Sequence, residues 1–135
     1  MEHFDRISRI DKIASASVLV VEDDYLIRMN AADIIEEAGF PVETTSDADQ
    51  ALRILGARRS IGVVFTDVHM PGSLNGLELA RLIGARWPAV GVIVTSGRAT
   101  RIDIPAGALF IAKPYSSSQL VGKIHTLLEE LADVH

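Results

Sequence analysis

The sequence predicts an α/β fold built around a parallel β-sheet. Short apolar runs alternate along the chain with amphipathic stretches, which is the pattern expected of repeated βα units. Four of these runs are followed, directly or within one residue, by a polar side chain that could take part in chemistry. The ligand crevice of an open α/β sheet lies outside the carboxyl ends of its strands, so these side chains should converge on one site.

The strands and helices can be assigned in order along the chain. The expected strands cover residues 17–21, 41–45, 61–66, 90–95 and 109–112. The expected helices cover residues 24–38, 48–57, 76–86 and 116–132, with Asp47 as an N-cap, Gly39 as a stop signal and Pro88 just beyond the third helix. The apolar faces are formed by Ile27, Ala31, Ile34 and Ala38 in the first helix, and by Leu120, Ile124, Leu127, Leu128 and Leu131 in the last.

The segment between the last two strands carries a weaker pattern than the rest of the chain. Gly97, Pro105 and Gly107 interrupt residues 96–108, and only residues 99–104 could form a helical turn or two. A regular βα repeat would place its fourth helix here. We therefore expect that fourth helix to be short, irregular or missing.

Residues 1–16 form an extension ahead of the expected domain, which covers residues 17–132 and leaves 133–135 as a tail. Phe4, Ile7, Ile10 and Ile13 recur at every third position, which predicts an amphipathic helix of about three turns. An isolated helix of that length is marginal in water, so its apolar side must pack on something. It could pack on its own domain or fray, or it could form a homodimer contact.

Composition excludes several classes of function. The chain has 135 residues, the usual size of one domain, and its net charge of −5 argues against a surface that binds nucleic acid through phosphates. It contains no cysteine, so disulfides, thiol catalysis and cysteine-ligated metals are excluded. No apolar stretch is long enough to span a membrane, and residues 1–17 lack the apolar core of a signal peptide, so we expect a cytoplasmic protein.

The carboxylates at the expected strand ends form a candidate metal site. Glu22 and Asp23 follow the first strand, and Asp67 follows the third. Two carboxylates about 4 Å apart repel by roughly 4 kcal/mol at an effective dielectric of about 20, so such a cluster needs a partner. Mg²⁺ prefers oxygen ligands and commonly combines one or two carboxylates with a phosphate. The cluster therefore predicts an Mg²⁺ site with room for a phosphoryl group.

Lys113 and Thr95 supply complementary groups from the last two strands. The Lys113 ammonium could neutralise a phosphoryl oxygen that the metal does not reach, and Thr95 offers a hydroxyl donor. Asp67, followed by an open loop with Pro71 and Gly72, is the best candidate for a nucleophile that forms an aspartyl-phosphate. Taken singly, each of these residues could be a helix cap, a turn residue or a surface charge. Four strands that each end in such a residue argue against that interpretation of the four together.

At these positions the chain resembles the receiver domain of bacterial two-component response regulators, the CheY-like family. The matching segments are Val18-Leu19-Val20-Val21-Glu22-Asp23-Asp24, Asp67-Val68-His69-Met70-Pro71, Val94-Thr95-Ser96-Gly97 and Lys113-Pro114-Tyr115. The resemblance covers residues 17–131, and its motifs are specific in combination. It implies a doubly wound, flavodoxin-like three-layer α/β sandwich whose five-stranded parallel sheet has the order 2-1-3-4-5, with helices on both faces.

The resemblance implies that Asp67 is the phosphoacceptor. It would take a phosphoryl group from a phosphohistidine of a sensor histidine kinase or a histidine phosphotransfer protein. Glu22 and Asp23 would hold Mg²⁺ together with Asp67 and the backbone carbonyl of His69. The His69 side chain would flank the site and point to solvent, because a hard Mg²⁺ site prefers oxygen ligands.

The resemblance also implies roles for the residues on the last two strands. Thr95 and Lys113 would bind the phosphoryl oxygens. Phe110 would be the aromatic switch residue, turning inward when Thr95 moves toward the phosphate. Gly97 and Pro114 would flank the site, and the bond between Lys113 and Pro114 is expected to be cis.

Four departures from the family pattern bear on function, and one of them is that His69 and Gly97 occupy flanking positions that tune phosphoryl lifetime in this family. Glu22 stands where aspartate is common, and its longer side chain could hold the metal through water. The loop from Met70 to Gly76 is one residue longer than the usual form, and the segment from Thr95 to Lys113 is shorter. The chain therefore differs from its family near a surface through which many receivers dimerise or bind targets.

The function that follows is a stand-alone phosphorylation switch and not an enzyme. Only residues 133–135 follow the last expected helix, so we expect no DNA-binding output domain; output would come from an unknown protein target or from draining phosphate from a kinase. A metal-dependent phosphatase working through an aspartyl-phosphate is a second hypothesis, although such enzymes commonly carry an acid where His69 stands. A receiver-like module that no longer uses phosphate is a third.

Overall fold

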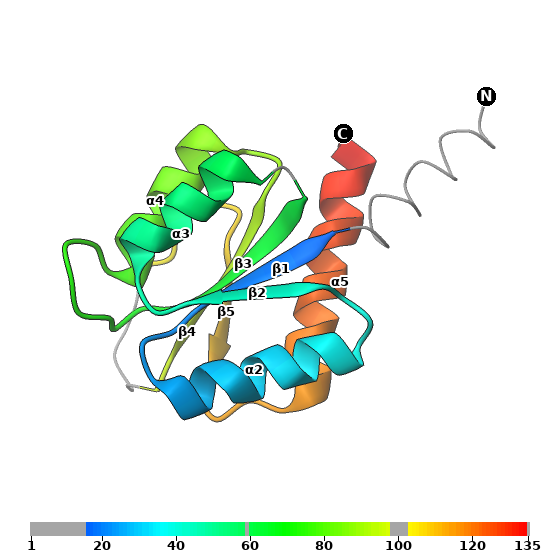
Figure 1. Ribbon diagram of the computed structural model, residues 1–135. Coiled ribbons are helices and arrows are strands. Elements are labelled where there is room, and N and C mark those ends of the chain that lie inside the picture. The colour runs from blue at the N-terminus through cyan, green and yellow to red at the C-terminus, as the bar shows by residue number, and fades with distance from the viewer. Residues whose placement is uncertain (1–15, 59, 98–102, 135) are drawn as a thin grey trace.

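The computed structural model describes residues 16–58, 60–97 and 103–134, which form a parallel sheet flanked by helices (Figure 1). The strands are β1 (Ser17–Val21), β2 (Val42–Thr45), β3 (Ile61–Asp67), β4 (Gly91–Ser96) and β5 (Leu109–Ala112). The helices are α2 (Tyr25–Glu37), α3 (Ala48–Ala57), α4 (Gly76–Arg86) and α5 (Ser117–Val134). The 5-stranded sheet has the order β2-β1-β3-β4-β5 with all neighbours parallel, which confirms the predicted fold class and strand order.

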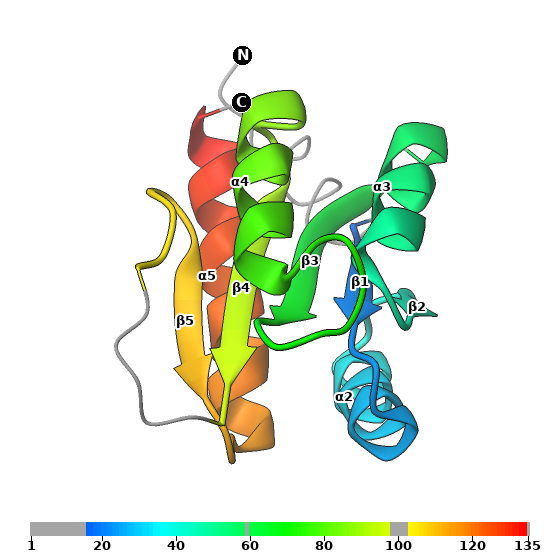
Figure 2. The same cartoon turned by 90° about the vertical axis from the view of Figure 1, so that its left-hand side faces the viewer.

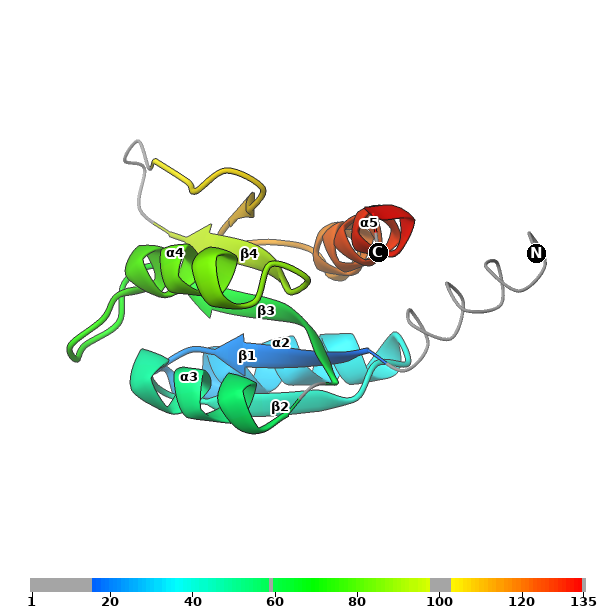
Figure 3. The ribbon, with the colours of Figure 1, turned by 90° about the horizontal axis from the view of Figure 1, so that it is seen from above.

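The sheet separates two helical layers. Helices α2 and α5 cover one face, and α3 and α4 cover the other (Figure 3). Successive residues of a strand point to opposite faces, so Val18 and Val20 of β1 pack on the α2 side, whereas Leu19 and Val21 pack on the α3 side. Each face therefore has its own apolar core, and all of β1 is buried, as a parallel sheet covered on both sides requires.

Polar caps set the starts of the helices that follow β1, β2 and β3. The Asp24 side chain accepts a hydrogen bond of 3.0 Å from an amide in the first turn of α2, and Asp47 does the same for α3 at 2.7 Å. Asn75 and Glu78 form a reciprocal pair at the start of α4, with both hydrogen bonds 2.9 Å long. Because the first amides of a helix have no partner within it, these side chains fix where each helix begins.

Two expectations about the helices need correction. The last helix runs to Val134, so residues 133 and 134 belong to α5 and not to a tail. In α2, Ala31, Ala32 and Ile35 are buried, and Ile27 is 37% exposed although it was expected on the buried face. Ile27 lies on the same side of the helix as Ala31, one helical turn before it. At that point it lines a small cavity beside the carboxyl ends of the strands.

The connection between β4 and β5 lacks a helix in residues 97 and 103–108, the part of it that the structure describes. This agrees with the weak pattern of the segment. Residues 105–108 form a turn in which the Ala108 amide donates to the Pro105 carbonyl at 3.1 Å, and Gly107 adopts a φ of +88°. The expected helix within residues 1–16 lies outside the described residues except for Ala16, which is buried.

Within the described parts of the chain, no helix is both long and apolar enough to cross a membrane.

Candidate functional site

The carboxyl ends of β1, β3, β4 and β5 meet at one edge of the sheet, and the predicted site residues lie there. Glu22 follows β1, Asp67 ends β3, Thr95 lies near the end of β4, and Lys113 follows β5. Figure 2 shows these strands running in the same direction toward this edge. The register places Asp67 directly opposite Thr95 on the neighbouring strand. The fold thus brings together residues that are far apart in the chain.

The Lys113 ammonium lies at the centre of the site. Its Nζ is 2.9 Å from Oε1 of Glu22 and 3.1 Å from Oδ2 of Asp67. Both carboxylates are nearly inaccessible, since Glu22 is 4% and Asp67 7% exposed. Burial acts to lower the pKa of Lys113, but the hydrogen bonds to the two carboxylates and their negative charges together outweigh burial and raise that pKa. The lysine therefore stays charged and ties β5 to β1 and β3.

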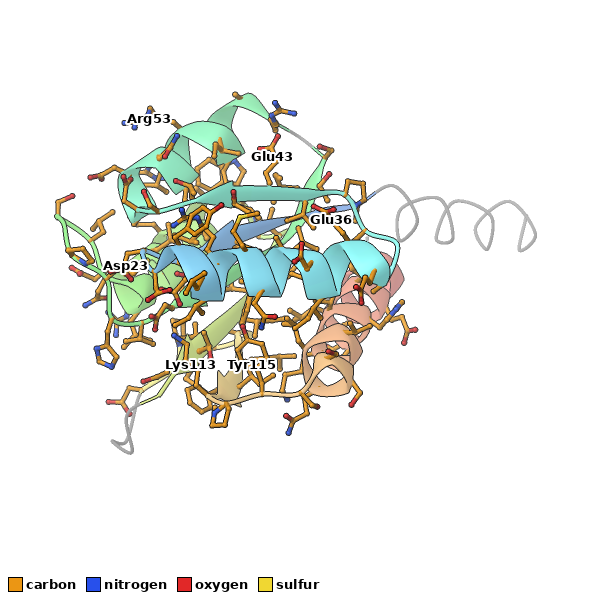
Figure 4. All side chains as sticks on the ribbon, turned by 60° about the horizontal axis from the view of Figure 1, so that its bottom comes forward. Asp23, Glu36, Glu43, Arg53, Lys113 and Tyr115 are labelled. Atoms are coloured by element: carbon orange, nitrogen blue, oxygen red, sulfur yellow. The ribbon has the colours of Figure 1, made fainter. Side chains whose placement is uncertain are left out.

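Glu22, Asp23 and Asp67 form an acidic cluster, with one carboxylate oxygen from each lying within 4.8 Å of the others. Asp23 is exposed just before α2, where Figure 4 labels it, whereas the other two are buried. Burial raises the pKa of Glu22; the hydrogen bond from Lys113 offsets part of this, and the charge of Asp67 adds to it. One ammonium thus leaves the three carboxylates incompletely compensated, and their oxygens are the ligands that a hard divalent cation prefers.

The loop that carries the acidic pair is held by contacts that sequence reasoning missed. Nη1 of Arg28 donates to the carbonyl oxygen of Glu22 at 2.7 Å and lies 3.4 Å from that of Asp23. The Asp24 amide donates to Oε2 of Glu22 at 3.2 Å. Together these contacts keep the Glu22 carboxylate turned toward Lys113. The available signal was the position of Arg28, one helical turn after the N-cap Asp24.

The backbone around Asp67 is fixed from both neighbouring elements. The Val68 amide donates to the Thr95 carbonyl of β4 at 3.0 Å, and the Gly76 amide of α4 donates to the Val68 carbonyl at 3.0 Å. Gly76 lies so close that any side chain there would overlap the carbonyl oxygen of Asp67. Gly76 is therefore a positioning residue for Asp67. Sequence alone placed it at a helix start and missed this contact, because the approach of two backbone segments leaves no local pattern.

The Thr95 hydroxyl is buried without a partner. Thr95 is 2% exposed, and within the described part of the chain its Oγ1 has no hydrogen-bond partner. An unsatisfied buried hydroxyl costs about 1–3 kcal/mol, so stability alone does not favour it. The same residue lines a small cavity with Glu22, Asp67 and Tyr115. An unpaired donor in such a place is suited to an anionic oxygen.

Two aromatic residues lie on β5 or just after it. Phe110 is partly buried and pairs in register with Val94, next to Thr95. Tyr115 packs edge-on against Phe65, with ring centroids 5.4 Å apart, and lines the small cavity that Phe110 does not line. Burial raises the pKa of Tyr115, so its hydroxyl stays protonated. The sequence identified Tyr115 only as part of a motif, and its place in the site was not predicted.

The three residues expected to flank the site are all exposed: His69, Gly97 and Pro114. The His69 amide donates to Oδ1 of Asp67 at 3.3 Å, so its peptide reaches the site although its side chain is exposed. A Cβ added at Gly97 would lie 3.7 Å from Cβ of Lys113, so that position borders the lysine. The bond between Lys113 and Pro114 is cis, as predicted.

Comparison with known proteins assigns the family. The model of the response regulator receiver domain matches residues 18–125. The chain belongs to the response regulator receiver domain family. The match confirms the family that the sequence resemblance indicated, and receiver domains are signalling switches.

This receiver domain is similar to segments of longer proteins. It is 36% identical over 121 residues to the nitrogen assimilation regulatory protein NtrX of Azorhizobium caulinodans, covering 84% of this chain and 26% of that protein. It is 32% identical over 128 residues to the sensor kinase CckA of Brucella abortus, covering 89% of this chain and 13% of that protein. The chain therefore spans about a quarter or less of the length of these relatives.

Solved structures show the same fold. A response regulator receiver domain protein from Clostridium thermocellum has a TM-score of 0.82 at 28% identity, covering 89% of this chain and 99% of that one. A CheY-like receiver domain protein from Methanospirillum hungatei has a TM-score of 0.81 at 26% identity, covering 89% of this chain and 98% of that one. These values confirm the CheY-like fold.

Proposed function

We propose that Asp67 is the phosphoacceptor of this receiver domain. Its phosphoryl group would come from a phosphohistidine of a sensor histidine kinase or a histidine phosphotransfer protein. The observation that supports this most directly is the contact of one ammonium, that of Lys113, with the buried carboxylates of Glu22 and Asp67 at 2.9 and 3.1 Å. This arrangement offers a carboxylate nucleophile beside a cation that can stabilise phosphoryl oxygens.

The proposed step is a transfer between an imidazole and a carboxylate. A carboxylate oxygen of Asp67 attacks phosphorus, the O–P bond forms, and the P–N bond to the donor histidine breaks as the imidazole leaves with that electron pair. Lys113 neutralises charge on one phosphoryl oxygen. The Thr95 hydroxyl, which is unpaired among the described residues, donates to another. Replacing an unsatisfied buried donor by a charge-assisted hydrogen bond stabilises the phosphorylated form.

The acidic cluster fits Mg²⁺, and we propose that Glu22, Asp23 and Asp67 hold it together with the backbone carbonyl of His69. The fit rests on three carboxylate oxygens within 4.8 Å of one another and on the repulsion between them that Lys113 does not fully relieve. When bound, the ion would supply the positive charge that lets an anionic phosphoryl group approach an anionic nucleophile.

The proposed output is a change of surface on the β4–β5 side. Thr95 would move toward the phosphoryl group, and Phe110, whose register partner Val94 adjoins Thr95, would turn inward. Tyr115 borders the cavity beside Thr95, so its ring is expected to respond as well. Figure 4 shows Tyr115 next to Lys113 on the same side as α2. An unknown protein target would read the altered surface by preferring one of the two states.

The proposed setting is a bacterial two-component phosphorelay in the cytoplasm. The similarity to the regulator NtrX and the sensor kinase CckA supports it, and the net charge of −5 argues against direct binding of nucleic acid. In this proposal the domain is a switch and not an enzyme, because it promotes only transfer and loss of its own phosphoryl group. Draining phosphate from a kinase is an alternative output that needs no target.

The test is the intact mass of the protein after incubation with acetyl phosphate and Mg²⁺. Wild type should gain one phosphoryl group, and Asp67→Asn should gain none. Asp33→Asn, which changes an exposed carboxylate on α2, should behave as wild type. EDTA should prevent the gain in every sample.

Three other outcomes would redirect the proposal. Labelling of Asp67→Asn as readily as wild type would contradict the assigned phosphoacceptor. Absence of labelling together with absence of Mg²⁺ binding would favour a phosphate-independent interaction module. Repeated turnover of a generic phosphate ester would favour a phosphatase.

A further inference from the structure

A groove opens at the amino edge of the sheet, the edge opposite the site. It has a volume of about 490 Å³ and lies between the second half of α4, the start of β4, residues 105–108 and the C-terminal half of α5. Its lining is mainly apolar and includes Ala80, Gly84, Val90, Pro105, Leu127 and Leu131. Because pockets that take ligands fall in the range of roughly 300–1,000 Å³, this space is too large for a packing defect.

The groove exists because β5 is short and begins late. The register pairs Leu109 of β5 with Ile93, so Gly91 and Val92 at the start of β4 have no β5 residue beside them. The chain ahead of β5 crosses this place as a turn, and the described residues between the two strands contain no helix that would cover it. The apolar surface is therefore left without a partner from the described parts of the chain.

The N-terminal segment, residues 1–15, joins the fold at Ala16, beside the C-terminal half of α5, which also lines the groove. The space above Gly62 of β3 is filled by Ala16 and Leu128, whose nearest atoms would lie 2.9 and 3.1 Å from an added Cβ. The space above Gly91 of β4 is filled in the same way by Leu127, at 3.1 Å. Strands β3 and β4 are neighbours, so Ala16 and the groove-lining Leu127 lie over adjacent strands on the same face of the sheet. Figure 2 shows the C-terminal end of α5 at this same edge.

The N-terminal segment has apolar residues that could fill the apolar groove. Its apolar residues Phe4, Ile7, Ile10 and Ile13 suit a helix with one apolar side. From residue 4 to residue 13 such a helix is about 14 Å long, and it cannot remain stable alone in water. The groove carries one exposed charge of each sign at its rim, Arg81 and Glu130, and the segment likewise carries both signs.

We propose that residues 1–15 bind as an amphipathic helix in the amino-edge groove of their own molecule. Ile7 and Ile10 would pack on Leu127 and Leu131, in the position left open by the missing helix between β4 and β5. The same molecule is favoured over a second copy because the point of attachment, Ala16, lies over the strand next to the one that groove-lining Leu127 covers, which gives the tethered segment a high effective concentration.

The absence of cysteine from the chain allows a direct test. Gly84→Cys places a thiol in the groove, at a position with nothing within 4 Å of an added Cβ. Gly56→Cys is the matched control, because Gly56 is an equally open helical glycine in the C-terminal part of α3 and does not line the groove. The measurement is the rate at which each thiol reacts with a water-soluble disulfide reagent. A second pair carries Ile7→Asp and Ile10→Asp in addition.

We expect the thiol at position 84 to react at least fivefold more slowly in the chain with the native segment than in the chain with both aspartates. The thiol at position 56 should react equally fast in both. Circular dichroism must show that all four variants are folded. Equal rates at position 84 would overturn the proposal. Protection at position 84 that disappears on dilution would also overturn it, because the segment of a second copy would then fill the groove.

Discussion

The two edges of the sheet differ in the kind of group that they leave unsatisfied. At the carboxyl edge, Glu22, Asp67 and Lys113 are buried or half-buried, and their backbones are tied to neighbouring elements by hydrogen bonds. At the amino edge, Leu131 and Pro105 line an apolar groove. The carboxyl edge has too little positive charge for its carboxylates and no partner for the Thr95 hydroxyl among the described residues. The amino edge has apolar side chains without an apolar partner in the described chain. One edge is therefore suited to a metal and a phosphoryl group, and the other to a hydrophobic segment.

The two edges also differ in how strictly the local packing requires a glycine. At the carboxyl edge, Gly76 faces the backbone of Asp67, which cannot move without moving β3. At the amino edge, Gly91 faces only the side chain of Leu127, at 3.1 Å. The nearest Leu127 atoms include its Cβ, so relief at Gly91 needs a shift of α5 by about a few tenths of an ångström, whereas relief at Gly76 needs a much larger shift of backbone held in β3. We conclude that the carboxyl edge is rigidly constructed and that the amino edge can adjust.

The largest expected effect tests this difference in rigidity. Gly76→Ala should destabilise the fold by about 3 kcal/mol, because the new methyl overlaps the Asp67 carbonyl. Gly91→Ala should cost about 1 kcal/mol, because α5 need shift by only a few tenths of an ångström at Leu127. Gly122→Ala, at an open position in α5, should be neutral or stabilise by up to about 1 kcal/mol. Urea unfolding of the three variants gives these values, and equal losses at positions 76 and 91 would show that the edges are alike.

The next effect tests the deficit of positive charge at the carboxyl edge. Saturating Mg²⁺ should raise the free energy of unfolding, by about 2.7 kcal/mol at a concentration one hundred times the dissociation constant. Asp23→Asn removes one member of the acidic cluster and should abolish most of this gain. Asp33→Asn, exposed on α2, should keep it. Thermal melts with Mg²⁺ and with EDTA measure the difference; a gain that survives Asp23→Asn would place the ion elsewhere.

A smaller effect separates two buried threonines of neighbouring strands. The Thr66 hydroxyl donates to the Asp67 carbonyl at 3.0 Å, whereas Thr95 has no partner among the described residues. Thr66→Val should therefore cost about 1 kcal/mol of stability, and Thr95→Val should be neutral or stabilise by up to about 1 kcal/mol. Thr95→Val should nevertheless slow labelling by acetyl phosphate. If Thr95→Val destabilises as much as Thr66→Val, its hydroxyl is satisfied and is not held ready for a ligand.

The smallest effect concerns pH in the absence of Mg²⁺. The folded protein holds the Glu22 proton more tightly than the unfolded chain, since burial raises the pKa of this residue. The stability linked to this proton is fully present below the ordinary value of 4.5 and is lost as pH rises through the folded pKa. Urea unfolding in EDTA should show wild type losing stability relative to Glu22→Gln as pH rises above 4.5. A constant difference across this range would contradict the raised pKa.

Much of this fold follows from local sequence patterns. The apolar runs that became β1, β3, β4 and β5 are short and end in polar residues, and the cap at Asp47 was identified from its type and position. Such signals depend only on neighbours in the chain, so they survive in a single sequence. The burial of Ile35 in place of Ile27 was not predicted, because periodicity defines a helical face but not where the sheet beneath that face ends.

The main polar residues of the candidate site were predicted from the sequence, but the residues that hold them in position were not. Glu22, Asp67, Thr95 and Lys113 stand at strand ends, so the direction of the strands alone brings them to one edge. Arg28, Gly76 and Tyr115 were missed because each acts through a contact with a backbone or a cavity that forms only on packing.

The sequence by itself determined which residues form strands, which residues cap the helices and which polar groups reach the carboxyl edge. All three depend on alternation and spacing along the chain. Only the tertiary structure decided that Lys113 bridges two carboxylates, one of them 91 positions away, that Thr95 has no partner among the described residues, and that a groove opens beside Leu127. These features depend on strand order, register and the approach of backbones. Such distances are set by the packing of the whole domain.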